Sequence, residues 1–207
     1  MGTQVQKHDD RVEIETAVHI SSMSICLLAQ GTVRWTVFAD GRIACQADMR
    51  REAGVPVFPR LGLRMMLPAD YDKLRYFAYG PLESYIDKRQ ASLLGWHADT
   101  VETQYAHPLR PQESGSHYGA RSLTLHGAQG ALRIEGAGFG FSALNYSQEQ
   151  LADVAHDDEL TREERCVLCL DMAQRGIGSN SCGPELPACY EIADHIQWQV
   201  MLDPLAE

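Results

Sequence analysis

Hydrophobic and polar residues alternate with a period of two along much of this 207-residue chain. Such alternation is typical of β-strands that bury one face and leave the other in water. It is clearest in 12–20 and 32–39, where the Asp40-Gly41 pair that follows predicts a tight hairpin. Further strands are expected at 42–49, 60–68, 74–80, 121–127, 131–138, 139–146, 166–174 and 190–202.

A helical signal occurs at one place. Ser147 stands before the run QEQLADVAH, and Gln150 follows three residues later, which together form the pattern of a capping box. This predicts a helix of about two turns. Many short strands with one short helix indicate an all-β protein, and no linker, repeat or low-complexity tract divides it. We therefore expect a single β-sandwich domain over residues 1–207.

Composition narrows the classes of partner. Hydrophobic residues make up 44% of the chain and charged residues 22%, which is ordinary for a soluble protein with a core. The formal net charge of −10 argues against nucleic acids and anionic membranes as partners. A membrane-spanning helix needs about 18 consecutive apolar residues, and the chain has no such stretch. The polar start MGTQVQKHDDRVEIE does not resemble a secretory signal, so a cytoplasmic location is expected.

The six cysteines are too few and too irregular for a disulfide scaffold. Cys166 and Cys169 form a C-x-x-C pair, yet they lie in the strand-like run RCVLCLDM, where residues three apart point to opposite faces. Buried, reduced thiols are the expected state. The histidines are dispersed and none lies at ligand spacing from another, so no metal site is predicted in this chain.

Two loops carry more charge than a plain sandwich needs. Acidic and basic side chains stand close together in 79–92 and in 107–121. They could form a catalytic pair or an internal network, and the network is predicted because ion pairs greatly outnumber active sites. The expected members are Glu83, Asp87, Lys88, Glu113, His117 and Arg121.

Four segments resemble a known family, the C-terminal domain or separate small chain of large bacterial β-galactosidases of the LacZ type. GPLESYIDK is similar to its motif G-P-x-E-x-Y-x-D-R, and PQESGSHYGAR is similar to P-x-E-N-G-x-R-x-x-x-R. FSALNYSQEQLADVAHDDEL resembles a third motif, and GIGSNSCGP resembles the loop G-x-G-G-D-x-S-W-G. The four occur in the family's order between residues 60 and 202. The resemblance implies a large antiparallel super-sandwich of the galactose-mutarotase-like type.

The resemblance also implies that the catalytic residues lie outside this chain. In this family the catalytic glutamates, and the magnesium and sodium sites, lie on a separate (β/α)₈ barrel, which takes about 250 residues. This chain is therefore expected to have no catalytic residue and no cofactor of its own. It is expected to be inactive alone in the hydrolysis of β-galactosides such as lactose. Its expected partner is the barrel domain or large subunit.

The fourth motif departs from the family pattern. The family's tryptophan offers the leaving-group sugar an apolar platform, whereas here the loop is one residue shorter and Cys182 stands nearest that position. The resemblance places the 176–184 loop at the rim of the sugar site. Without the tryptophan we expect weaker aglycone binding, a roomier acceptor subsite or a different preferred disaccharide. The rim residues it implies are Ser179, Asn180, Ser181 and Cys182.

Two other functions stay open from the residues alone. A free-standing sugar mutarotase needs a general acid and base, for which Glu113 and His117 are candidates. A carbohydrate-binding module needs exposed aromatic rings, but Trp35 and Trp198 lie within strand patterns and are expected in the core. If the chain is a fragment of a longer protein, it would expose an apolar face that neighbouring domains normally cover, and that face could support a homo-oligomer.

Overall fold

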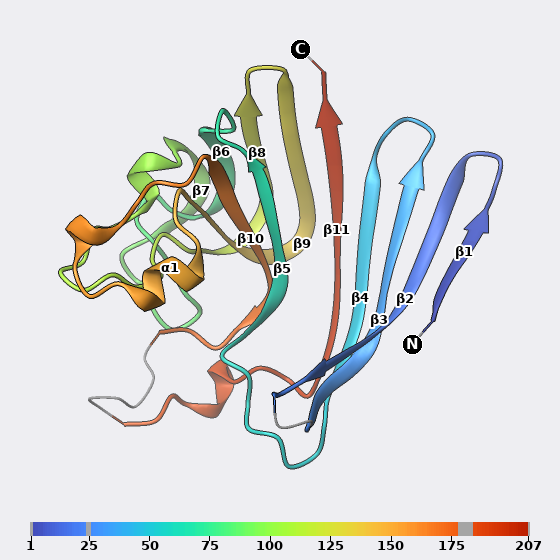
Figure 1. The fold of residues 1–207 in the computed structure, drawn as a ribbon, viewed down its shortest axis with the longest axis horizontal. Coiled ribbons are helices and arrows are strands. Elements are labelled where there is room, and N and C mark those ends of the chain that lie inside the picture. The colour runs from blue at the N-terminus through green and yellow to red at the C-terminus, as the bar shows by residue number, and fades with distance from the viewer. Residues whose placement is uncertain (1, 24–25, 178–183, 207) are drawn as a thin grey trace.

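The computed structural model describes residues 2–23, 26–177 and 184–206. It confirms an all-β, antiparallel fold with one short α-helix (Figure 1). The strands are β1 (Thr3–Lys7), β2 (Arg11–Ser21), β3 (Leu27–Phe38), β4 (Ile43–Arg51), β5 (Arg60–Pro68), β6 (Lys73–Gly80), β7 (Leu93–Thr100), β8 (His117–Gly127), β9 (Gly130–Leu144), β10 (Arg165–Gln174) and β11 (His195–Leu205). The helix is α1 (Gln148–Asp153), and single 3₁₀ turns occur at Glu102–Gln104, Asp157–Glu159 and Ala188–Tyr190.

Most predicted elements are present, with informative differences. The helix starts as expected, because the Ser147 side chain accepts a hydrogen bond from the backbone N–H of Gln150. The two strands predicted at 131–138 and 139–146 are one long strand, β9. Strands β1 and β7 were not predicted. β7 is an edge strand whose Leu93 and Trp96 are largely exposed, so it lacks the alternation of a half-buried strand.

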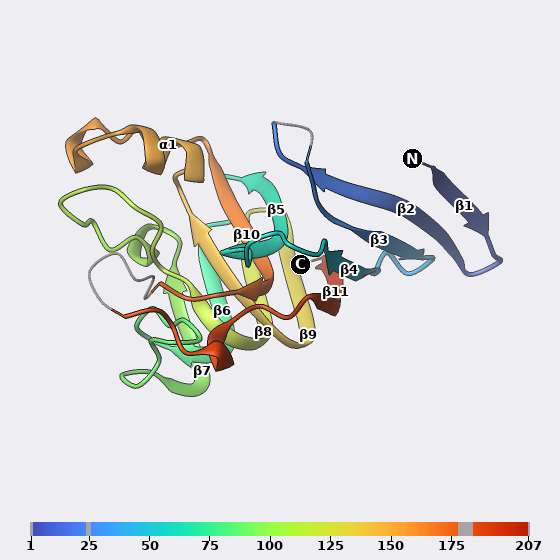
Figure 2. The same cartoon turned by 90° about the horizontal axis from the view of Figure 1, so that it is seen from below.

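Strand β9 belongs to two layers. Along the sheet the strand order is β1-β2-β3-β4-β11-β9-β8-β6-β7. The first half of β9 pairs with β11, and its second half, Gly140–Leu144, pairs with β10, which in turn pairs with β5. Strands β5 and β10 thus lie over β6, β8 and β9 and form a β-sandwich (Figure 2). The core between them includes Tyr76, Leu123, Ile134, Phe141, Leu168 and Leu170.

β10 is buried on both faces, which explains its cysteines. Cys166 and Cys169 are both free thiols, 1% and 5% exposed. Cys169 accepts a hydrogen bond from Gln148 of α1 at 3.3 Å, and burial raises the pKa of Cys166 to about 12. The expectation of buried, reduced thiols is confirmed. No helix in the described part of the chain is long and apolar enough to cross a membrane.

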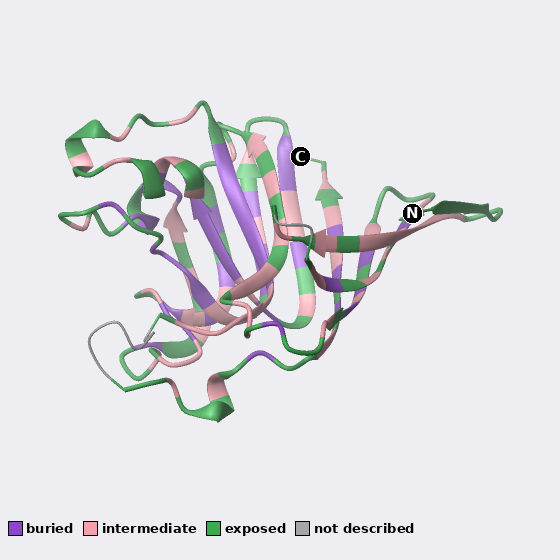
Figure 3. Cartoon of the chain, turned by 60° about the horizontal axis from the view of Figure 1, so that its bottom comes forward, coloured by how far each residue is buried: buried purple, intermediate pink, exposed green. Residues whose placement is uncertain are grey.

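Strands β1, β2 and β3 project beyond the two-layered part, and we call them the wing (Figure 2). Their residues are mostly exposed or half-buried, whereas many residues of β8, β9 and β10 in the two-layered part are buried (Figure 3). The N-terminal end of the described chain lies at the outer edge of the wing (Figure 1).

Candidate functional site

The motif-bearing segments meet around one cavity of about 640 Å³. Its walls come from the loop after β6, the loop before β8, helix α1, and Gly176 and Ile177 of the loop after β10. Lining side chains include Glu83, Tyr85, Lys88, Glu113, Leu151 and Ile177. Residues almost a hundred positions apart in the sequence therefore share one site.

Glu83 ties two of these loops together. Its carboxylate accepts hydrogen bonds from Lys88 Nζ at 2.6 Å, from the Gly115 N–H at 3.0 Å and from the Tyr85 hydroxyl at 3.3 Å. Partial burial acts to raise the pKa of Glu83, but these donors outweigh it and the pKa is lowered. Position 115 favours glycine because its φ is +68° and a Cβ there would lie 2.2 Å from the Gln104 carbonyl oxygen. Glu83 is thus ionised, and its three hydrogen bonds give it a structural role.

His117 is buried at the start of β8 and is 1% exposed. Its Nδ1 lies 3.1 Å from the Tyr79 carbonyl oxygen and its Nε2 lies 2.6 Å from Gln104 Oε1. Gln104 in turn donates to Asp99 at 3.0 Å. Burial lowers the pKa of His117 to about 4, despite the neighbouring carbonyl and carboxylates. The imidazole is therefore neutral near pH 7 and closed to solvent.

Glu113 is linked to the two-layered part through Arg60. The Arg60 guanidinium bonds to both Glu113 and Asp171, and Asp171 is 2% exposed. Burial raises the pKa of Asp171, although Arg60 acts against it. Sequence reasoning missed Arg60 and Asp171. The available signal was the lone carboxylate in the otherwise apolar strand run CVLCLDM.

Asp87, in the loop after β6, contacts the start of the loop after β10. The Ile177 N–H donates to Asp87 Oδ1 at 3.3 Å, and the Arg175 N–H donates to the Pro59 carbonyl at 2.9 Å. Gly176 has φ of +99°, and a Cβ there would lie 2.1 Å from Asp87 Oδ1. These contacts fix where the chain leaves β10. The implied rim residues Ser179, Asn180, Ser181 and Cys182 lie outside the described residues.

The predicted network residues are therefore not one cluster. Glu83 and Lys88 are paired, Asp87 holds the loop start, Glu113 joins Arg60, and His117 joins Gln104. Arg121 is exposed on β8, and no hydrogen bond or ion pair joins its side chain to another described residue. Within the described ranges, no group of three or more His, Cys, Asp or Glu side chains is arranged to hold a metal ion.

Comparison with known proteins matches almost the whole chain to one family. The family model described as "Beta galactosidase small chain" matches residues 2–202. The β-galactosidase of Actinobacillus pleuropneumoniae is 34% identical over 191 residues, 92% of this chain and 19% of that protein. Those of Staphylococcus xylosus and Streptococcus thermophilus are 32% and 33% identical over 96% and 98% of this chain. The chain spans about a fifth of the length of these curated relatives.

Proposed function

This chain belongs to the β-galactosidase small-chain family, and we propose that it is a non-catalytic part of a LacZ-type, family-two β-galactosidase. The complete enzyme would hydrolyse terminal β-galactosides such as lactose. Its (β/α)₈-barrel domain or large subunit would supply the nucleophile, the acid/base glutamate and the magnesium and sodium sites. This chain would complete the rim of the sugar site with its 176–184 loop.

The observation that carries the proposal is the convergence of the four motif segments on one cavity at the base of that loop. Glu83, Lys88 and Asp87 come from one motif, and Gly115 and Glu113 come from a second. Their contacts bind the loops to one another and to Ile177. Such an arrangement suits a scaffold that presents a loop to a neighbouring domain.

The carboxylates around the cavity suit this structural role better than catalysis. A retaining glycosidase needs two carboxyl groups about 5 Å apart, one of which is a general acid with a raised pKa. Glu83 has a lowered pKa and three donors, and Glu113 is paired with Arg60. Asp171, whose pKa is raised, is paired with Arg60 and is only 2% exposed.

The two alternatives gain less support. A mutarotase would need His117 to exchange protons with a sugar, yet both ring nitrogens contact oxygen acceptors and the residue is 1% exposed. A carbohydrate-binding module would use Trp96, which is exposed. However, the Arg75 guanidinium lies over that ring, 4.5 Å from its centroid, and occupies one of its faces.

Complementation tests the proposal. Hydrolysis of a chromogenic β-galactoside is measured for this chain, for the remaining part of the enzyme and for the two together. We expect hydrolysis only when both are present, because the chain lacks the catalytic pair. Anomer interconversion is measured in parallel, and mutarotation by the isolated chain would overturn the proposal.

A substitution in the loop tests its placement at the sugar site. In the complete enzyme, Cys182→Trp should strengthen binding of glucose as an acceptor by about 1–2 kcal/mol, since an aromatic ring buries more of the sugar's apolar face. Recognition of galactose should be nearly unchanged. An equal response for both sugars, or none for either, contradicts this placement.

A further inference from the structure

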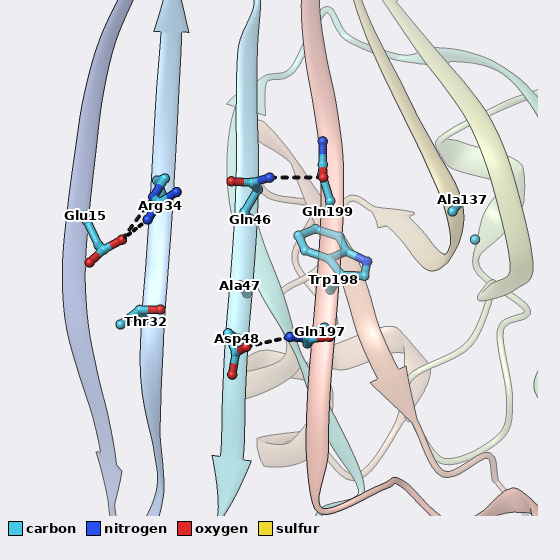
Figure 4. Close-up of a pocket in the computed structure, with 11 residues that line it drawn as sticks. Glu15, Thr32, Arg34, Gln46, Ala47, Asp48, Ala137, Gln197, Trp198 and Gln199 are labelled. Carbon is cyan, nitrogen blue, oxygen red and sulfur yellow. Dashed lines mark hydrogen bonds and ion pairs between the residues drawn. The ribbon is translucent and has the colours of Figure 1, made fainter. Parts of the chain in front are cut away.

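The sheet formed by the wing together with β4 and β11 has one polar face. The directly opposed residues Gln4, Glu15, Arg34, Gln46 and Gln199 form a polar row across five strands. Neighbouring side chains in this row bind one another: Glu15 forms an ion pair with Arg34, and Gln46 donates a hydrogen bond to Gln199 at 3.1 Å (Figure 4). Asp48 and Gln197 on the same face make a similar pair at 2.8 Å (Figure 4).

The opposite face of the same strands is apolar. One residue further along each strand, Val5, Ile14, Trp35, Cys45 and Val200 are directly opposed and share that face. Cys45 and Val200 are 0% and 1% exposed because the two-layered part covers them. Along the row toward the edge, Trp35 and Ile14 are half-buried and Val5 is 56% exposed.

A second row repeats this gradient. Val12, Val37, Ile43, Leu202 and Ile134 are directly opposed in neighbouring strands. Ile134 is 0% exposed, Leu202 is 6% exposed and Val37 is 37% exposed. The apolar face therefore continues outward beyond the layer that covers its inner end. Among the described elements, the main contacts of β2 are with its sheet neighbours β1 and β3 only (Figures 2 and 3).

We propose that the apolar face of the wing, centred on Val5, Ile14 and Trp35, docks against an apolar surface of the rest of the β-galactosidase. This partner is the one named in the proposed function, so the inference rests on that function. Soluble proteins rarely leave a continuous apolar patch of this kind open, since burial contributes about 25 cal/mol per Å².

The length of the relatives favours the rest of the enzyme, rather than a second copy of this chain, as the partner that covers this face. The matched region is about a fifth of each relative, so four-fifths of the polypeptide is available in the same molecule. A covalently linked or stably bound partner acts at an effective concentration of about millimolar, which a second copy at ordinary protein concentrations does not reach.

Paired cysteine variants test the docking surface. Val5→Cys lies on the apolar face, and Gln4→Cys, the matched control, lies next to it on the polar face of the same edge strand. Both native residues are exposed, so neither substitution removes core packing. The rate of maleimide labelling at each position is followed by peptide mass spectrometry, in the isolated chain and in the complete enzyme.

We expect both positions to label at similar rates in the isolated chain. In the complete enzyme, labelling of Val5→Cys should slow by about tenfold or more, while labelling of Gln4→Cys changes by less than about twofold. Equal labelling of the two positions in the complete enzyme overturns the proposal. Protection of Val5→Cys already in the isolated chain, with a doubled mass in light scattering, overturns it in favour of a second copy.

Hydrolysis by the same samples separates the two proposals. An active complete enzyme in which Val5→Cys still labels rapidly rejects the docking surface and leaves the proposed function standing. Protection of Val5→Cys in an assembly that does not hydrolyse β-galactosides rejects the proposed function and leaves the docking surface standing.

Discussion

The two-layered part and the wing are built from the same alternation but end in different environments. In β8, Leu123 and Leu125 alternate with polar residues and are both 0% exposed. In β2, Val12 and Ile14 alternate in the same way and remain half-buried. The difference teaches that a period of two predicts which face of a strand is apolar, whereas a second layer decides whether that face is buried.

Charged pairs show the same contrast. Arg60 and Asp171 connect two strands inside the two-layered part, where Asp171 is almost completely buried. Arg34 and Glu15 connect two strands of the wing on its solvent face. The first pair cannot lose a partner without leaving a charge in a poorly solvated place, while water replaces either partner of the second.

The largest expected effect is the loss of the buried pair. Asp171→Ala should lower the free energy of unfolding by about 3–5 kcal/mol, because the Arg60 charge loses its buried partner. Glu15→Ala in the wing is the control, with an expected change of about 0–1 kcal/mol. Urea denaturation followed by fluorescence measures both. Similar losses for the two variants would show that the parts do not differ in this way.

The next largest difference in stability between the two parts should come from truncating an apolar residue in each. Leu123→Ala is expected to cost about 2–5 kcal/mol, since it opens a cavity between the two layers. Ile14→Ala is expected to cost about 1 kcal/mol in the isolated chain, because its side chain is only half-buried. In the complete enzyme the thermal stability should become more sensitive to Ile14→Ala. An equal cost in the isolated chain and the complete enzyme contradicts a covered wing.

The buried histidine should make the two-layered part sensitive to acid. In the folded chain the pKa of His117 is about 4, below the ordinary value of 6.5. As the pH falls between these values, the unfolded chain takes up a proton that the folded chain does not. The free energy of unfolding should therefore fall by on the order of 3 kcal/mol. Denaturation curves of wild type and His117→Gln between pH 7 and about pH 4 measure this. Parallel pH profiles for the two proteins would refute it.

The smallest expected difference concerns two glycines with positive φ. At the hairpin after β3, Gly41 has φ of +90° and open space where a Cβ would be, so Gly41→Ala should cost about 1 kcal/mol. Gly176→Ala should cost about 2 kcal/mol, since its Cβ would also meet Asp87. Adding Asp87→Ala should relieve part of the second cost, as measured by a double-mutant cycle in urea. Strict additivity would contradict the contact.

Much of the fold could be predicted because its signals are local. Alternation located β5 to the residue, and the cap at Ser147 located the helix. Edge strands escaped this reasoning. β1 is five residues long and exposed throughout, so its sequence carries little of the pattern that burial imposes on inner strands.

The candidate site was only partly predictable, because its pairings are not local. The Glu83–Lys88 pair spans five residues and follows from their closeness in sequence. The Arg60–Asp171 pair joins residues 111 positions apart, and nothing near either residue indicates the other. The resemblance to β-galactosidases identified the segments that meet at the cavity, but the contacts between them depend on how the two layers close.

The position of β11 has a consequence for the order in which the molecule can form. Among the described strands it alone joins β4 of the N-terminal sheet to β9, by pairing with β4 over 195–202 and with β9 over 200–205. It is also the last of these strands to be synthesised. Until it leaves the ribosome, no strand pairing connects the first fifty residues to the two-layered part. A chain that stops before His195 should therefore behave as two loosely tethered pieces.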